Sequence, residues 1–222
     1  MTDGVTPQQF VDAEGLEDWR VVGDGACAFY RADSFATSAR FVQGIAEAIG
    51  AEGRQPDLDI RNGGVTVRLI TITEDYAGMT RRDIEVAQRV AAVAREQGVT
   101  ADPSLVQSLL VVVGSKAPSE VMPFWQAALG YERRADSPDE DLVDPGDRGP
   151  GFWFEAMQTM RPDGGGAIHV AVWLPYEEAE ARVSAALAAG GRIVRDDFAP
   201  SWWTLADAAG NEIDVSTVEG RG

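Results

Sequence analysis

The second half of the chain repeats itself at a distance of 61 residues. The segment AALGYERR (127–134) aligns with AAGGRIVR (188–195), and the same shift places Ser108 on His169. In each copy, an apolar strand is followed by an amphipathic helix that stops at glycine and then by three short extended segments. The predicted elements are strand 108–113, helix 119–129 and strands 131–134, 142–144 and 152–157 in the first copy, and strand 168–174, helix 176–189 and strands 192–195, 202–206 and 212–217 in the second. Such a repeat indicates a domain built from two equivalent modules.

The first half of the chain has a different order of elements. The predicted elements are a short helix within 6–20, a strand at 26–32, a helix from Asp33 or Ser34 to Gly50 or Gly53, strands at 58–61 and 65–72 joined by the turn Asn62-Gly63-Gly64, and a helix from Thr80 to about Gln97. We expect these elements to form a small antiparallel sheet with helices on one face. The stretch VTADPSLV (99–106) is typical of a linker. The sequence therefore predicts an α+β protein with domains at 1–100 and 106–219, the second made of modules 106–160 and 166–219.

Composition narrows the possible partners and chemistry. The chain has 36 acidic and 19 basic side chains, and a net charge of −17 disfavours nucleic acid and anionic membranes as partners. Cys27 is the single cysteine and His169 the single histidine, which excludes a disulfide scaffold within the chain and any mechanism that needs two histidines. No apolar run reaches the roughly 18 residues of a membrane span, and the acidic, polar N-terminus is unlike a signal peptide. We therefore expect a cytoplasmic protein whose partner is a small molecule.

The repeated half resembles the vicinal oxygen chelate superfamily, and within it the glyoxalase-like, bleomycin-resistance-type members. The segments FWQAALGY and LADAAGNEIDV are the basis of this resemblance, which covers residues 106–219. It implies a curved sheet around a cleft, with metal ligands from the first and fourth strands of each module. By position these would be Ser108 and Glu155 in the first module and His169 and Asp214 in the second.

Ser108 is the weak member of this set, because a hydroxyl is a poor metal ligand at neutral pH. We therefore predict no cofactor, and we name His169, Glu155 and Asp214 as the candidate ligands if a divalent metal is bound. The alternative is that His169 is a hydrogen-bonded sheet residue and that the two carboxylates are solvated or paired. Without a metal, the cleft would bind a planar or aromatic ligand. The candidate ligand-binding residues are Trp153, Trp173, Trp202, Trp203, Glu155 and His169, although alternation along the strands implies that some of these rings belong to the core.

The first half resembles the pterin-4a-carbinolamine dehydratases. The resemblance rests on EDWRVV, FVQGIAEAIGAEGRQPDLDI and VRLITITEDYAGMTRRDIEVA. It implies dehydration of a 4a-hydroxypterin by a His-His-Pro segment, a third histidine and an aspartate at a helix start. In this chain the His-His-Pro positions fall on Arg54, Gln55 and Pro56, the third histidine falls on Ile72, and the aspartate is retained as Asp83.

None of these replacements can act as an imidazole does. Arginine stays protonated, glutamine does not titrate and isoleucine is inert, so the sequence predicts an inactive dehydratase-like domain. Only Asp83 and Arg54 remain as candidate catalytic residues. Asp83 also has an ordinary interpretation, since Thr80 and Asp83 match a capping box at a helix start.

Three functional hypotheses follow. In the first, the chain is a small-molecule-binding protein that joins an inactive dehydratase-like domain to a metal-free cleft domain. The alternatives are a metal-dependent vicinal oxygen chelate enzyme of lyase or dioxygenase type, and a residual 4a-hydroxytetrahydrobiopterin dehydratase, which is also a lyase. Because members of both families commonly associate and the edge of a small sheet favours pairing, we expect a homodimer.

Overall fold

The computed structural model describes residues 3–51, 55–159, 167–206 and 212–220. The chain divides into two compact units, Met1–Val106 and Gln107–Gly222. Within the described residues, no helix combines the length and the apolar character needed to cross a membrane.

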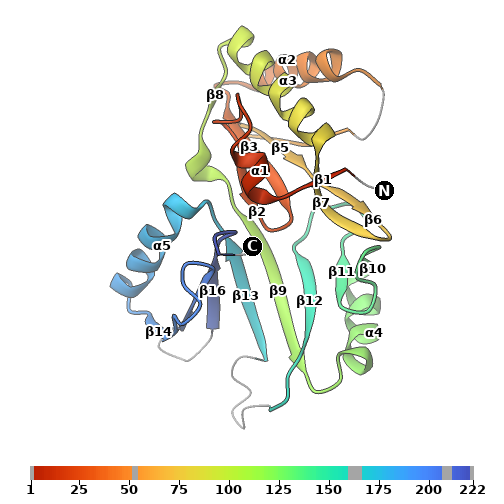
Figure 1. Ribbon diagram of the computed structural model, residues 1–222, viewed down its shortest axis with the longest axis vertical. Helices are drawn as coiled ribbons and strands as arrows, with labels where there is room; N and C mark the ends of the chain where they lie inside the picture. The colour runs from red at the N-terminus through yellow and green to blue at the C-terminus, as the bar shows by residue number, and fades with distance from the viewer. Residues whose placement is uncertain (1–2, 52–54, 160–166, 207–211, 221–222) are drawn as a thin grey trace. The chain divides into compact units, whose positions relative to one another are not determined.

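In the first unit, helices pack with strands (Figure 1). Its elements are β1 (Gly4–Val5), α1 (Pro7–Val11), β2 (Arg20–Val22), β3 (Gly25–Arg31), α2 (Phe35–Ile49), β4 (Asp57–Arg61), β5 (Gly64–Leu69), β6 (Thr71–Thr73), β7 (Tyr76–Thr80), α3 (Arg81–Gln97), β8 (Thr100–Ala101) and the 3-10 turn η1 (Pro103–Leu105). The main sheet has the antiparallel order β2-β3-β5-β4, and β8 also pairs with β3. A second, three-stranded sheet has the order β1-β7-β6.

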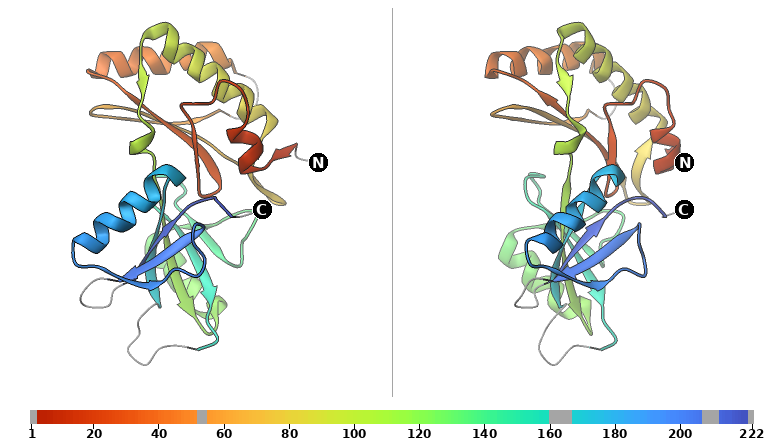
Figure 2. Two further views of the ribbon diagram at one scale, coloured as in Figure 1. Left: turned by 60° about the vertical axis from the view of Figure 1, so that its left-hand side comes forward. Right: turned by 90° about the vertical axis from the view of Figure 1, so that its left-hand side faces the viewer.

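Helices α2 and α3 pack against each other on one face of the main sheet (Figure 2). The Ser34 side chain caps α2 by accepting from the backbone N–H of Thr37 at 3.1 Å, and the helix ends at Gly50, whose φ of 74° glycine adopts without strain. The core between helices and sheet is mainly apolar, with Ser38 of α2 and Asp83 of α3 as its buried polar residues among those described. Its fully buried members include Tyr30, Phe41, Ile45, Val65, Val67 and Val86.

Several short elements of this unit differ from the sequence prediction. The helix expected within 6–20 is only the five residues of α1, and the strand expected at 65–72 is interrupted at Ile70. The segment 99–106 is not a linker, because Ala101 pairs with Tyr30 and the Asp102 backbone N–H donates to the Phe29 carbonyl at 2.8 Å. A two-residue strand has no periodic pattern of its own, so the Asp-Pro-Ser composition dominated the prediction.

The second unit confirms the predicted tandem architecture. Its elements are β9 (Ser108–Ser115), α4 (Pro118–Leu129), β10 (Glu132–Arg133), β11 (Asp141–Val143), β12 (Gly151–Ala156), β13 (Ile168–Trp173), α5 (Tyr176–Ala188), β14 (Arg192–Arg195), β15 (Trp202–Ala206) and β16 (Glu212–Ser216). All eight strands form one sheet in the order β10-β11-β12-β9-β13-β16-β15-β14. The first strand of each module pairs in parallel with the last strand of the same module, and β9 pairs with β13 antiparallel.

The repeat in the sequence is visible in the register of the central strands. Leu110 lies opposite Ala171 in the β9–β13 pair. Because these two residues are themselves 61 positions apart, they occupy equivalent places in the two modules, and the approximate two-fold axis of the repeat passes between them.

Both helices of the second unit cover the same face of its sheet. Under α4, Met122 packs with Val113 and Phe154, and under α5, Val183 packs with Val172. Val113 and Val172 belong to the same alternating set of the β9–β13 pair, because Val113 lies opposite Ile168 and Val172 opposite Leu109. The other set of side chains forms what we call the helix-free face.

Candidate functional site

The candidate site lies on the helix-free face of the second sheet. Three of the four predicted tryptophans, Trp153, Trp173 and Trp202, belong to this face by strand alternation and register. Trp203 does not, because it packs against the core cluster beneath α5. The double Trp202-Trp203 pattern therefore places one ring on each face, and Trp203 has no place in the site.

Two of these tryptophans share one row across the strands. Trp173 pairs with Ser108 on β9 and with Ser216 on β16, and Ser216 pairs in turn with Trp202 on β15. Trp173 and Trp202 are thus separated by the single small residue Ser216. Phe198 extends the row, because its ring stacks on that of Trp202 with centroids 4.2 Å apart and an interplanar angle of 12°.

The next row of the helix-free face has a leucine between two small residues at its centre. Gly151, Leu110 and Ala171 lie side by side on β12, β9 and β13. One row further, Trp153 lies opposite Val112, which also lies opposite His169. Aromatic rings from both modules are therefore placed on two sides of this row of Gly151, Leu110 and Ala171, which we call the floor and which lies at the axis of the repeat.

A chain of polar side chains borders this floor. The Thr204 hydroxyl donates to Asp214 Oδ1 at 2.6 Å, and Asp214 Oδ2 lies 3.2 Å from His169 Nε2. The three residues lie on the neighbouring strands β13, β16 and β15. Thr204 is buried, and the side chains of His169 and Asp214 are only 13% and 16% exposed. His169 is therefore a hydrogen-bonded sheet residue paired with a carboxylate. Thr204 was not singled out from the sequence, although its position two residues after Trp202 on a predicted strand places it on the same face.

The proposed metal ligands do not converge. Glu155 pairs with Gly114, whereas His169 lies opposite Val112 and contacts Asp214 directly. The described residues contain no group of three or more His, Cys, Asp or Glu side chains that could hold a metal ion. The residues present do not fit a metal centre of this type.

The register explains why the assignment by position failed. On β16, Asp214 lies beside Ala171, while on β12 the residue beside the equivalent Leu110 is Gly151. The structural counterpart of Asp214 is therefore Gly151, and Glu155 lies four residues further along its strand. The first module thus has no carboxylate at the place where the second module has one.

In the first unit, Asp83 acts as a helix cap. Asp83 Oδ2 accepts from the Thr80 backbone N–H at 2.7 Å, from the Thr80 hydroxyl at 2.7 Å and from the Thr71 hydroxyl at 3.3 Å. The side chain is 3% exposed. Thr80 Oγ1 accepts from the Asp83 backbone N–H in return, which completes the predicted capping box.

The remaining dehydratase positions have no acid–base group among the described residues. Arg54 lies outside the described residues. Gln55 donates its side-chain N–H to the Gly50 carbonyl at 3.2 Å, and Ile72 is paired with Ala77 in β6 and β7. An amide and an aliphatic side chain therefore stand where the resemblance implies imidazoles.

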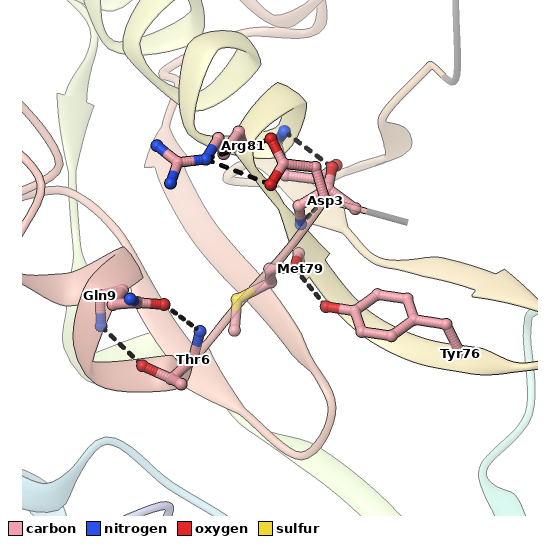
Figure 3. A network of polar contacts seen from close by, with 8 residues as sticks. Asp3, Thr6, Gln9, Tyr76, Met79 and Arg81 are labelled. Atoms are coloured by element: carbon pink, nitrogen blue, oxygen red, sulfur yellow. Dashed lines mark hydrogen bonds and ion pairs between the residues drawn. The ribbon is translucent and has the colours of Figure 1, made fainter. Parts of the chain in front are cut away.

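The N-terminal strand lies close to this helix start (Figure 3). Gly4 pairs with Thr80, and the Asp3 carboxylate forms an ion pair with Arg81 at 3.1 Å. The Tyr76 hydroxyl donates to the Met79 carbonyl. Burial raises the pKa of Tyr76, and the nearby Asp83 carboxylate raises it further.

Comparisons with known proteins agree with this division. Residues 4–93 match the family model described as Pterin 4 alpha carbinolamine dehydratase, and residues 110–216 match the model described as Glyoxalase-like domain. A protein of Nocardia farcinica, provisionally named a pterin-4-alpha-carbinolamine dehydratase, is 35% identical over 95 residues, which cover 42% of this chain and 98% of that protein. A similarly named protein of Gloeobacter violaceus is 34% identical over 88 residues, covering 37% of this chain and 94% of that protein. Both sequence resemblances are confirmed.

Two solved structures align with about half of the chain, each at 14% identity. One is a protein of Legionella pneumophila described as an NAD-dependent benzaldehyde dehydrogenase, which covers 49% of this chain and 97% of that chain with a TM-score of 0.36. The other is a glyoxalase/bleomycin resistance protein/dioxygenase superfamily member from Vibrio splendidus 12B01, which covers 50% of this chain and 99% of that chain with a TM-score of 0.33. At these scores neither similarity bears on the function of this chain.

Proposed function

Because the chain belongs to the pterin 4 alpha carbinolamine dehydratase family through its first unit and has a glyoxalase-like domain as its second, we propose that it is a small-molecule-binding protein. In this proposal the first unit is an inactive dehydratase-like domain. The helix-free face of the second unit binds a planar or aromatic ligand without a metal. The observation that supports this most directly is the placement of Trp153 and Trp202, from the two modules, on two sides of the floor, with Trp173 buried in the row of Trp202.

The inactivity of the first unit is inferred from the groups that remain there. Acid–base catalysis needs a side chain that exchanges a proton at the reacting atom. Oδ2 of the one retained acidic candidate, Asp83, already accepts three hydrogen bonds inside the fold, and Gln55 and Ile72 have no exchangeable proton of suitable pKa. We expect no dehydration of a 4a-hydroxytetrahydropterin above the spontaneous rate, and turnover that depends on Asp83 would contradict the proposal.

The binding role of the second unit follows from the chemistry of its helix-free face. Aromatic rings stack on flat ligands. Each stacked pair of rings contributes about 0.5–1.5 kcal/mol to binding, in addition to the free energy gained by burying apolar surface. The Thr204-Asp214-His169 chain adds polar groups at the edge of the floor, which can orient a heteroaromatic ring through hydrogen bonds.

The test is a titration of the intact protein with planar probes, namely 6-methylpterin, lumichrome and 2-naphthamide, followed by tryptophan fluorescence and calorimetry. We expect saturable binding of at least one probe. Trp202→Ala should weaken that binding about three- to tenfold, because one stacking contact is lost. Trp203→Phe is the matched control, because Trp203 packs on the opposite face, and its affinity should equal that of the wild type. Absence of saturable binding, or an equal loss in both variants, would refute the proposal.

A further inference from the structure

The edge of the second sheet contains an irregularity that places one charge beside the candidate site. In the β14–β15 pair, Ile193 lies opposite Leu205, but Arg195 lies opposite Thr204. Val194 is therefore an extra residue, and the pair contains a β-bulge. Bulges of this kind re-aim the side chains that follow them.

The bulge determines which face Arg195 occupies. With a regular register, Val194 would lie opposite Thr204, and Arg195 would lie opposite Trp203 on the helix-covered face. Because of the extra residue, Arg195 shares a face with Thr204, whose hydroxyl donates to Asp214. One inserted residue thus moves a guanidinium from the core side of the sheet to the helix-free face.

Arg195 is also held against the aromatic row of the site. Its guanidinium carbon lies 5.2 Å from the centre of the Phe198 ring, and Phe198 stacks on Trp202. The backbone beneath this stack is fixed, because the Phe198 carbonyl accepts from the N–H of Ser201 at 2.8 Å and of Trp202 at 3.3 Å. Arg195 and Trp202 therefore both contact the Phe198 ring, and Arg195 itself is exposed.

We propose that the helix-free face recognises an aromatic carboxylate, whose ring stacks on the Phe198–Trp202 pair and whose acid group pairs with Arg195. This inference rests on the proposed binding function and names the class of its ligand. A planar guanidinium matches the geometry of a carboxylate and forms two parallel hydrogen bonds with it. Across the described residues, no acidic side chain lies within ion-pair distance of Arg195.

The charge of the whole chain makes the ring a necessary part of this ligand. The net charge is −17, and Asp196 and Asp197 follow Arg195 directly. A small free anion is repelled by this field, and an exposed single cation holds it only weakly. The stacking surface supplies the additional binding, and the guanidinium then selects the charged ligand over its neutral analogue.

The test compares two matched pairs of probes, pterin-6-carboxylate with pterin-6-carboxamide and 2-naphthoate with 2-naphthamide, on the full-length protein. We expect at least one carboxylate to bind about fivefold to tenfold more tightly than its amide, with a preference that weakens as salt is raised. Arg195→Gln should abolish the preference and leave the amide affinity unchanged. Arg192→Gln is the control, because Arg192 lies on the same strand and face, opposite Ala206, and should keep the preference.

The outcomes separate this inference from the binding function on which it rests. If wild-type protein binds carboxylate and amide equally, the inference is wrong and the binding function stands. If no probe binds, the binding function itself fails. If Arg192→Gln loses the preference as fully as Arg195→Gln, the effect is one of general charge, and the assignment to Arg195 is wrong. Both arginines are exposed, so both variants should melt at the wild-type temperature.

Discussion

Asp144 organises the loop between β11 and β12. Its carboxylate accepts from the backbone N–H groups of Gly146 at 2.9 Å and of Arg148 and Gly149 at 3.1 Å, and the Arg148 guanidinium also donates to it. The hydrogen bond from Arg148 is the largest cause that lowers the pKa of Asp144 to about 2, followed by that from Gly146. A carboxylate that accepts this many hydrogen bonds is favoured in its charged form.

This lowered pKa predicts how the loop responds to acid. A group whose pKa is lower in the folded than in the unfolded state stabilises the fold fully above its unfolded value, about 3.9, and loses that effect as the pH falls through its folded value. The amide signals of Gly146 and Gly149 should therefore shift in an NMR titration with a midpoint near 2, between pH 5 and 1.5. Asp144→Asn should remove this transition. Asp139→Asn, in the preceding connection between β10 and β11 and 95% exposed, should leave it intact, and a midpoint near 4 in the wild type would contradict the prediction.

Other single residues had two possible roles in the sequence, and the sequence could not choose between them. Thr80 and Asp83 were predicted both as a capping box and as part of a site, and the capping box is present with every hydrogen bond. His169 was predicted either as a metal ligand or as a hydrogen-bonded sheet residue, and it pairs with Asp214. The Thr80–Asp83 contacts are local, whereas the contact that decides the role of His169 comes from another strand, β16, and is absent from the local pattern.

At the scale of elements, the sequence predicted the long helices, whose apolar residues recur periodically, and it missed several short strands. Helices α2 and α3 lie within a residue or two of their predicted bounds, since their apolar faces repeat over several turns. Strands β1, β2, β7 and β8 were not predicted. They have two to five residues, and their existence depends on a partner strand.

The N-terminal strand offers a direct test of such a partnership. A Cβ atom on Gly4 would lie 2.7–2.9 Å from the hydroxyl, Cε2 and Cζ atoms of Tyr76. We expect Gly4→Ala to lower the free energy of unfolding by about 1–3 kcal/mol, as overpacking does, and to increase hydrogen exchange in β1 and β7 (Figure 3). In a Tyr76→Ala background the same substitution should cost almost nothing. An equal cost in both backgrounds would show that the ring does not determine the docking of β1.

At the scale of the whole molecule, each unit has its own buried core. The first includes the buried Phe41, Ile45 and Val86, and the second has one cluster under each of its two helices. A unit that buries its own core is expected to fold alone. The homodimer expected from the sequence stays a prediction.

The unit boundary at Val106 can be tested with fragments of the chain. Fragments 1–106 and 107–222 should each unfold cooperatively in far-UV circular dichroism. A shorter fragment, 1–99, lacks β8, the Asp102–Arg31 ion pair and the buried Val106. It should be less stable than 1–106 by about 2 kcal/mol, on the basis of one buried valine side chain. Equal stability of 1–99 and 1–106 would mean that residues 100–106 are a linker after all.

The sequence by itself determined the two families, the α+β class and the tandem modules, because periodicity and repetition are properties of the chain. It also required Trp202 and Trp203 to lie on opposite faces, since successive strand residues alternate. Only the tertiary structure decided which of the two faces the site, that Glu155 is remote from Asp214, and that Arg195 turns toward Thr204. These facts depend on hydrogen-bonding register between strands, and a shift of one residue moves every side chain to the other face.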